Sequence, residues 1–300
     1  MLTRPLGNTG MNVTVLGHGG AEIGYEQVEQ RRASELLNAA LDAGLNVIDT
    51  AACYRASEEL IGKAVGHRLQ DYFIFTKCGH ASGLPYADWS PELLAASIDR
   101  SLSRLQTDHV DLVQLHGCSA EVLARGAVTD VLEKARAAGK TRFIGYSGDG
   151  AAALAAIATG RFATLQTSLN IADQEAITLT IPAAAARQMG VIVKRPVANV
   201  AWISGTLPAN TYAHEYYHRL EKLKYPFLTK PDSVGAALRF TLSVPGVSTA
   251  IVGTSKIGRW RENAAAAEQG ALPAAEYEAI RARWKELAAS GPAADWHGRG

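Results

Sequence analysis

The chain has 300 residues, of which 47% are hydrophobic and 20% charged, and its 30 Lys and Arg nearly balance 29 Asp and Glu. This composition excludes a disordered chain and leaves no basic surplus for binding nucleic acid or an anionic membrane surface. Three cysteines without CxxC spacing argue against a disulfide framework and a zinc site, so we expect no metal. The first residues hold no apolar leader and no apolar run approaches a bilayer span, so we expect a cytoplasmic protein.

Strand and helix patterns alternate along the chain. The expected strands are residues 13–17, 47–49, 72–76, 111–115, 141–145, 164–166, 191–193 and 249–252. The expected helices are residues 31–43, 58–65, 91–105, 122–138, 151–158, 181–188, 233–242 and 260–267. Short, continuous apolar strands are typical of parallel strands covered on both faces. Eight such units in succession favour a closed (β/α)8 TIM barrel of the α/β class, formed by residues 1–300 as a single domain.

Three segments fall outside this repeat. Residues 4–15 have the pattern of a β-hairpin with its turn at 7–10, which we expect to plug the bottom of the barrel. Residues 196–231 form a long insertion between the seventh strand and its helix, with a helical stretch over 213–223 and many aromatic residues. Residues 273–289 predict an extra C-terminal helix, and a tail follows it to residue 300.

Four ionisable side chains stand at or just after the ends of three successive strands: Asp49, Tyr54, Lys77 and His116. In a (β/α)8 barrel these strand ends converge on one mouth, where active sites lie. Taken singly, such residues can cap a loop, face solvent or pack. Together they fit acid catalysis, because an ammonium group lowers the pKa of a nearby phenol and a neutral histidine can donate to a carbonyl oxygen. The missing component is a hydride donor, which no side chain supplies.

Five segments of the sequence resemble the aldo-keto reductase superfamily. Residues 44–62, with Asp49 and Tyr54, are similar to the family's first signature, and residues 73–77 are similar to its lysine strand. Residues 97–116, 139–147 and 251–263 resemble its histidine, strand-five and cofactor-closing segments. The resemblance runs from about residue 4 to 267. It implies a barrel enzyme that reduces an aldehyde or ketone reversibly, by direct hydride transfer from a nicotinamide dinucleotide bound without a Rossmann motif.

The resemblance also implies the role of each catalytic candidate. Tyr54 would donate the proton, Lys77 and Asp49 would be its tuning pair, and His116 would orient the carbonyl group. The substrate would be a small-molecule aldehyde or ketone.

The same resemblance implies how the cofactor is held. Ser147 and Gln166 would bind the carboxamide of the nicotinamide. The other positions implied to contact the cofactor are Lys194, Arg195, Gly253, Thr254, Ser255, Lys256, Arg259, Glu262 and Asn263. Among them, Ser255, Lys256 and Arg259 would face the adenosine 2′-phosphate, so NADP(H) is the expected cofactor and NAD(H) the alternative.

Three departures from the family pattern bear on this cofactor site. Gly148 and Asp149 follow the fifth strand, where asparagine is common. Lys194 and Arg195 end the seventh strand, where many members have tyrosine. The Arg195 guanidinium could stack on the nicotinamide or contact a phosphate or carboxylate, and the sequence leaves both alternatives open. Gly253 stands where many NADP-specific members have lysine.

Loops over the mouth are expected to set substrate specificity. The candidate pocket residues are Ile23, Tyr25, Tyr86, Trp89, Trp202 and Trp296. Each of them could instead pack its own loop. The three cysteines, Cys53, Cys78 and Cys118, lie beside catalytic candidates, either as small apolar fillers or as thiols whose oxidation slows turnover.

Two rival functions belong to other classes. One is a nucleotide-binding regulatory subunit of low turnover, and the other is a Schiff-base lyase with Lys77 as its nucleophile. Asp49 argues against the lyase, because a carboxylate partner keeps the lysine charged. For assembly we expect a monomer.

Overall fold

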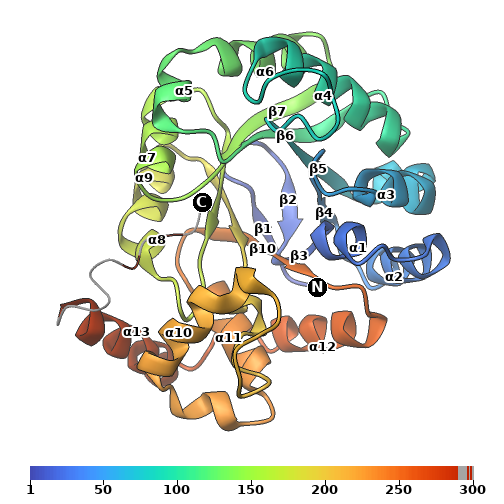
Figure 1. The fold of residues 1–300 in the computed structure, drawn as a ribbon. Coiled ribbons are helices and arrows are strands. Elements are labelled where there is room, and N and C mark those ends of the chain that lie inside the picture. The colour runs from blue at the N-terminus through green and yellow to red at the C-terminus, as the bar shows by residue number, and fades with distance from the viewer. Residues whose placement is uncertain (290–295, 297, 299–300) are drawn as a thin grey trace.

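Eight parallel strands pair in chain order and close into a barrel, with β10 hydrogen-bonded to β3 (Figure 1). The computed structural model describes residues 1–289, 296 and 298. The barrel strands are β3 (Leu16–Gly19), β4 (Val47–Asp49), β5 (Phe73–Cys78), β6 (Val110–His116), β7 (Thr141–Ser147), β8 (Thr164–Ser168), β9 (Gly190–Lys194) and β10 (Val247–Gly253). The predicted (β/α)8 fold is therefore confirmed.

Helices surround the barrel on its outer side (Figure 1). The helices that follow the barrel strands are α1 (Ala21–Tyr25), α2 (Gln30–Asp42), α3 (Ser57–Val65), α4 (Pro91–Leu105), α5 (Ala120–Ala124), α6 (Ala127–Ala137), α7 (Gly150–Thr159), α8 (Glu175–Thr178), α9 (Thr180–Ala186), α10 (His214–Leu223), α11 (Ser233–Leu242) and α12 (Ile257–Glu268). The single helix predicted over 122–138 is two helices, because Gly126 takes a left-handed φ of 75° between α5 and α6. The short helices α1 and α8 were not predicted.

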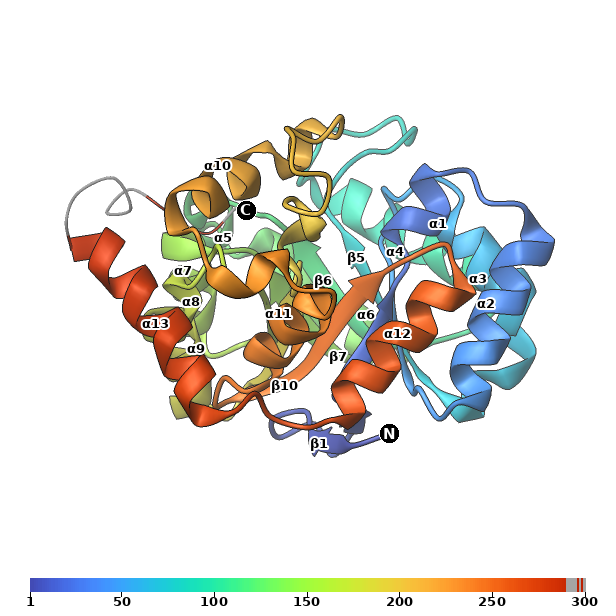
Figure 2. The same cartoon turned by 90° about the horizontal axis from the view of Figure 1, so that it is seen from below.

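The N-terminal hairpin closes the bottom of the barrel, as predicted. Its strands are β1 (Thr3–Pro5) and β2 (Asn12–Thr14), which pair antiparallel, and it lies at the opposite end from α10 (Figure 2). Leu6, Met11 and Val13 pack with apolar side chains of the barrel interior. The strand predicted at 13–17 is wrong in its bounds, because it joins the end of β2 to the start of β3.

Strand alternation explains which side chains reach the mouth. The strand residues of the apolar interior cluster are Val47, Phe75, Leu112, Ile192 and Ile251. Side chains two residues apart on a strand point to the same side. Asp49 and Lys77 each stand two residues beyond a member of this cluster, and His116 stands four beyond one. All three therefore face the barrel interior at the carboxyl end.

The insertion after β9 and the last helix, α13 (Ala274–Ala289), build a second apolar cluster outside the barrel. Tyr216 and Tyr225 of the insertion pack in it together with Phe240 of α11 and Trp284 of α13. This packing accounts for the aromatic content of the insertion. The predicted C-terminal helix is confirmed. In the part of the chain that the structure describes, no helix has the length and apolar character needed to cross a membrane.

Candidate active site

A buried ion pair joins the ends of β4 and β5. Lys77 Nζ donates to Asp49 Oδ1 and, at 2.8 Å, to the carbonyl oxygen of Thr50. The two side chains are only 2% and 1% exposed. Burial raises the pKa of Asp49, and the Lys77 ammonium group partly offsets this. A pair of this kind is stable only when its remaining oxygens and protons are also hydrogen-bonded.

Two glutamine amides complete the environment of Asp49. Gln166 Nε2 on β8 donates to Asp49 Oδ2 at 3.0 Å, and Gln114 Nε2 on β6 reaches the same oxygen at 3.4 Å. The role of Gln114 was not found in the sequence. Gln114 could have been found from its position two residues before His116 on β6, because strand alternation places both side chains in the barrel interior.

Tyr54 lies between the ion pair and His116. Lys77 Nζ is 5.2 Å from the centroid of its ring, and the Tyr54 and His116 rings meet edge to face with centroids 5.6 Å apart. Burial and then the Asp49 carboxylate raise the pKa of Tyr54 well above 10. The expected lowering of this pKa is therefore wrong for this structure, because burial and the Asp49 carboxylate both act in the opposite direction. The phenol keeps its proton.

His116 is neutral at physiological pH. Burial lowers its pKa well below 6.5, and the positive charges of Lys77 and Lys194 lower it further. Its ring has two close neighbours: Cys53 Sγ lies 3.4 Å from His116 Nδ1, and the His80 ring centroid lies 5.5 Å away. A neutral imidazole has one N–H and can donate to a carbonyl oxygen, as the sequence predicted.

Two polar atoms at the neighbouring strand ends are buried without a hydrogen-bond partner among the described residues. They are Ser147 Oγ, at the end of β7, and Gln166 Oε1 on β8. Buried polar atoms are nearly always paired in native proteins. These two are therefore free to bind an amide such as the carboxamide of a nicotinamide, the group for which the sequence singled them out.

Asp149 and Lys194 form a second charged pair, at the ends of the strands that follow β6. Lys194 Nζ, at the end of β9, lies 3.2 Å from Asp149 Oδ2. Asp149 also accepts from Ser168 N at 2.6 Å and from Thr167 Oγ1 at 2.8 Å. Burial raises the pKa of Asp149, but Lys194 and these donors outweigh it, so the net shift is downward. The sequence noted Asp149 only as a departure and did not find this network.

Arg195 has a left-handed φ of 59°, which is uncommon for a residue with a side chain. Its NH1 donates to Ser168 Oγ at 2.8 Å, and its guanidinium carbon lies 4.7 Å from the centroid of the Tyr212 ring. Tyr212 belongs to the insertion, so Arg195 links the insertion to the barrel mouth. Neither partner was identified from the sequence.

The end of β10 and the segment after it contact two acidic residues, Glu22 in α1 and Glu26 at the C-terminal end of that helix. Ser255 Oγ donates to Glu26 Oε2, and the Glu22 carboxylate lies against Gly253, where an added Cβ would be 1.5 Å from Glu22 Oε2. Thr254, beside them, is buried, and Lys256 is exposed. Sequence reasoning missed Glu22 and Glu26, because neither lies near this segment in the chain.

The rest of the segment lies on α12. Arg259 NH1 is 2.8 Å from Glu262 Oε2, and both side chains are exposed. Asn263 is buried.

The six candidate pocket residues do not gather in one place. The Tyr25 ring lies 5.7 Å from the Tyr54 ring, and the Trp89 ring lies 5.3 Å from that of His80. The remaining four lie as follows: Tyr86 is exposed, Ile23 is buried in the main hydrophobic core, Trp202 donates to Ser233 Oγ, and Trp296 packs on Trp284. Ile23, Trp202 and Trp296 thus follow the alternative in which such residues pack within the fold.

The other two cysteines pack in the hydrophobic core. Cys78 is buried in the main hydrophobic core, and Cys118 is buried with it. Burial raises the pKa of each thiol to about 12, so both are inert thiols. Their packing agrees with the filler alternative.

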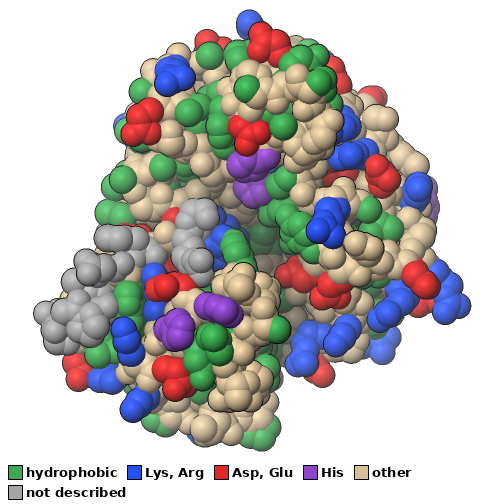
Figure 3. Space-filling model, viewed as in Figure 1, with side chains coloured by type: hydrophobic (Ala, Val, Ile, Leu, Met, Phe, Trp, Pro, Cys, Tyr) green, Lys and Arg blue, Asp and Glu red, His purple; other side chains and the backbone are tan. Residues whose placement is uncertain are grey.

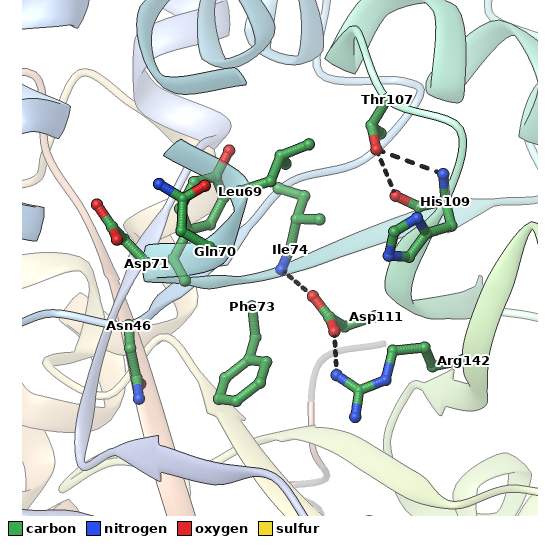
Figure 4. Close-up of a pocket in the computed structure, with 11 residues that line it drawn as sticks. Asn46, Leu69, Gln70, Asp71, Phe73, Ile74, Thr107, His109, Asp111 and Arg142 are labelled. Carbon is green, nitrogen blue, oxygen red and sulfur yellow. Dashed lines mark hydrogen bonds and ion pairs between the residues drawn. The ribbon is translucent and has the colours of Figure 1, made fainter. Parts of the chain in front are cut away.

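A polar cavity of about 330 Å³ lies at the other end of the barrel (Figure 4). Asp111 spans it, accepting from Ile74 N at 2.9 Å and pairing with Arg142 NH1 at 2.6 Å. Phe73, at the start of β5, also lines it, whereas Lys77 is near the end of that strand. The cavity therefore belongs to the base of the barrel. Among the described residues no cluster of three or more His, Cys, Asp or Glu side chains is arranged to hold a metal ion.

Comparison with known proteins identifies the family of the chain. The model of the "Aldo/keto reductase family" matches residues 15–285. The chain is 26% identical to uncharacterized oxidoreductase YqkF of Bacillus subtilis over 95% of this chain and 97% of that one. It is 36% identical to L-galactose dehydrogenase of Arabidopsis thaliana over 48% of each chain. The holo form of aldo-keto reductase AKR11C1 from Bacillus halodurans has a TM-score of 0.83 and 27% identity, covering 94% of this chain and 96% of that one. The chain belongs to the aldo/keto reductase family and is an oxidoreductase acting on CH–OH or carbonyl groups.

Proposed function

We propose that this protein reduces a small aldehyde or ketone to the alcohol, reversibly, with a nicotinamide dinucleotide as hydride donor and Tyr54 as general acid. The observation that carries the proposal is the position of Tyr54, with the buried Asp49–Lys77 pair under its ring and His116 at its edge. A space-filling view shows a hollow at the centre of this face, bordered by histidine and hydrophobic side chains (Figure 3).

The residues present fit a nicotinamide cofactor. The unpaired Ser147 Oγ and Gln166 Oε1 offer an acceptor and, from the hydroxyl, a donor for its carboxamide. The bound cofactor would supply the hydride, which is the one component that side chains lack. Lys256 and Arg259 are the cations that a 2′-phosphate would meet, and they are the basis of the NADP(H) expectation.

Tyr54 holds the proton that the product alcohol needs. Its high pKa keeps the phenol protonated at neutral pH, while the carbonyl oxygen becomes strongly basic only as negative charge develops on it. When the proton leaves, the Lys77 ammonium group stabilises the phenolate that forms. Asp49, held by Gln166 and Gln114, keeps that ammonium group in place. In the oxidative direction the same groups take the proton back.

His116 orients the carbonyl group. As a neutral imidazole it donates one hydrogen bond, and its edge-to-face contact with Tyr54 brings that bond and the phenol to the same oxygen. Lys77, by contrast, is unsuited to Schiff-base chemistry, because its ammonium protons are bound to Asp49 and to the Thr50 carbonyl.

The test is turnover of NADH and NADPH with a panel of small aldehydes, ketones and aldoses, the last because one relative is an L-galactose dehydrogenase. Replacing the general acid, in Tyr54→Phe, should lower kcat by about 100-fold or more while nucleotide binding is retained. Tyr277→Phe on α13, stacked on Phe240 away from the mouth, is the matched control. Nucleotide binding without turnover by the wild type would support the regulatory-subunit alternative instead.

A further inference from the structure

We propose that Glu22 and Glu26 make the nucleotide end of this site selective for NAD(H) over NADP(H). The inference rests on the proposed function and replaces the cofactor preference expected from Lys256 and Arg259. It depends on the contacts that the two carboxylates make with the segment after β10, which the sequence assigned to the 2′-phosphate.

The Ser255 hydroxyl already donates its hydrogen bond to a carboxylate. Ser255 Oγ is buried and donates to Glu26 Oε2, at the end of α1. A hydroxyl group has a single proton to donate. With that proton on a carboxylate, Ser255 presents only lone pairs to an incoming phosphate, and the carboxylate brings its own negative charge to the same place.

Glu22 fills the space that Gly253 leaves. Its carboxylate lies so close that a Cβ at Gly253 would be 1.5 Å from one oxygen and 2.6 Å from the other. Burial raises the pKa of Glu22, and the nearby Glu26 carboxylate raises it further. Two acidic groups therefore face one short segment of backbone. Acidic side chains gather beside the central hollow between the positions of α1 and α12 (Figures 1 and 3).

The cations of the segment do not offset this pair. Arg259 is 2.8 Å from Glu262 and both side chains are exposed, so its charge is largely balanced by its own helix. Lys256 is exposed to solvent. Glu26 is also exposed, so solvent screens its charge as it screens that of Lys256, whereas Glu22 is partly buried and its charge is screened less.

A carboxylate at this position favours binding of NAD(H) and disfavours binding of NADP(H). A carboxylate accepts hydrogen bonds from the vicinal hydroxyls of an unmodified ribose, which is how acidic residues recognise NAD in dinucleotide-binding folds. A 2′-phosphate removes one of these donors and adds negative charge, so the same carboxylate repels it. Selectivity for NAD(H) thus needs no cation.

The test is fluorescence titration of the full chain with NADH and with NADPH. We expect the wild type to bind NADH at least ten-fold more tightly than NADPH. In Glu26→Gln, and in Glu22→Gln, NADH should bind more weakly and NADPH more tightly, so that the ratio falls. Glu35→Gln on α2, an exposed carboxylate paired with Arg31, is the control and should keep the wild-type ratio.

Ser255→Ala provides a second, independent readout. If its proton is on Glu26, NADPH affinity should change by less than two-fold. Tighter binding of NADPH than NADH by the wild type, with weaker NADPH binding in Ser255→Ala, would overturn the inference and leave the proposed function standing. Binding of neither nucleotide would overturn both.

Discussion

Cys53 Sγ lies 3.4 Å from His116 Nδ1, on the side of the imidazole away from its other ring nitrogen. Burial raises the pKa of the Cys53 thiol, so the sulfur keeps its hydrogen and can donate it weakly to Nδ1. A histidine whose Nδ1 accepts carries its own hydrogen on Nε2. If the thiol is the donor in this contact, the hydrogen of the imidazole is on Nε2, where it can be donated to a substrate oxygen.

Removing this donor should weaken substrate orientation without abolishing catalysis. In Cys53→Ala we expect a several-fold rise in KM for the carbonyl substrate and a smaller fall in kcat, and Cys53→Ser should restore the wild-type values because its hydroxyl can donate. Steady-state kinetics of the three proteins checks this. Wild-type KM in Cys53→Ala, or no rescue by serine, would show that Cys53 only fills space.

The Asp49–Lys77 pair should matter for stability as well as for activity. Asp49→Asn leaves a buried ammonium group without its counter-ion, which should lower the free energy of unfolding by about 3–5 kcal/mol. The double variant Asp49→Asn/Lys77→Met should recover part of this loss and stay inactive. Urea unfolding monitored by fluorescence measures the first effect and turnover the second. Equal stability of wild type and Asp49→Asn would contradict the pairing.

The rate of carbonyl reduction should be insensitive to pH across the neutral range. Tyr54 must be protonated and His116 neutral, and their pKa values lie well above 10 and well below 6.5 respectively. Both conditions hold throughout the interval between those values. The check is kcat/KM measured over that interval at constant ionic strength. A titration within it that disappears in Tyr54→Phe would show that the phenol ionises there.

His18 gives a separate pH effect, on stability. It is fully buried in β3, neither ring nitrogen has a hydrogen-bond partner among the described residues, and burial lowers its pKa from 6.5 to about 4. Above pH 6.5 the histidine is neutral in both folded and unfolded chains, so the stability of the protein does not depend on its protonation. Between pH 6.5 and about 4 only the unfolded chain takes up the proton, and stability falls by about 1.4 kcal/mol per pH unit.

Urea unfolding at several pH values should therefore separate His18→Phe from the wild type. The difference in unfolding free energy between the two proteins should change in favour of the variant as the pH falls from 6.5 to 4. His218→Gln, an exposed histidine on α10, is the control and should track the wild type. Parallel pH curves for wild type and His18→Phe would contradict the pKa shift.

Strand alternation made much of the site predictable. Asp49, Lys77 and His116 follow apolar interior residues at even spacing, and polar residues at the carboxyl ends of parallel strands converge in a barrel. Local signals failed where one residue changes the chain's direction. Gly126 ended a helix that its neighbours would have continued, and the short step between β2 and β3 separated the hairpin from the barrel.

Contacts between distant segments could not be predicted in the same way. Ser255 and Glu26 are 229 positions apart, and no local pattern joins α1 to the segment after β10. The direction of the Tyr54 pKa shift could not be predicted from the sequence either, because it depends on how deeply the ring is buried and on how close the Asp49 carboxylate lies. In both cases the deciding quantity is tertiary geometry.

In the proposed reduction a bound nicotinamide dinucleotide would supply the hydride to the carbonyl carbon, and Tyr54 would protonate the oxygen. The most direct measurement uses nicotinamide dinucleotide carrying deuterium at C4, with the product examined by mass spectrometry. We predict one deuterium on the carbinol carbon with the wild type and almost none formed in the same time with Tyr54→Phe. Product whose new carbon-bound hydrogen comes from solvent, or equal transfer by Tyr54→Phe, would contradict the account.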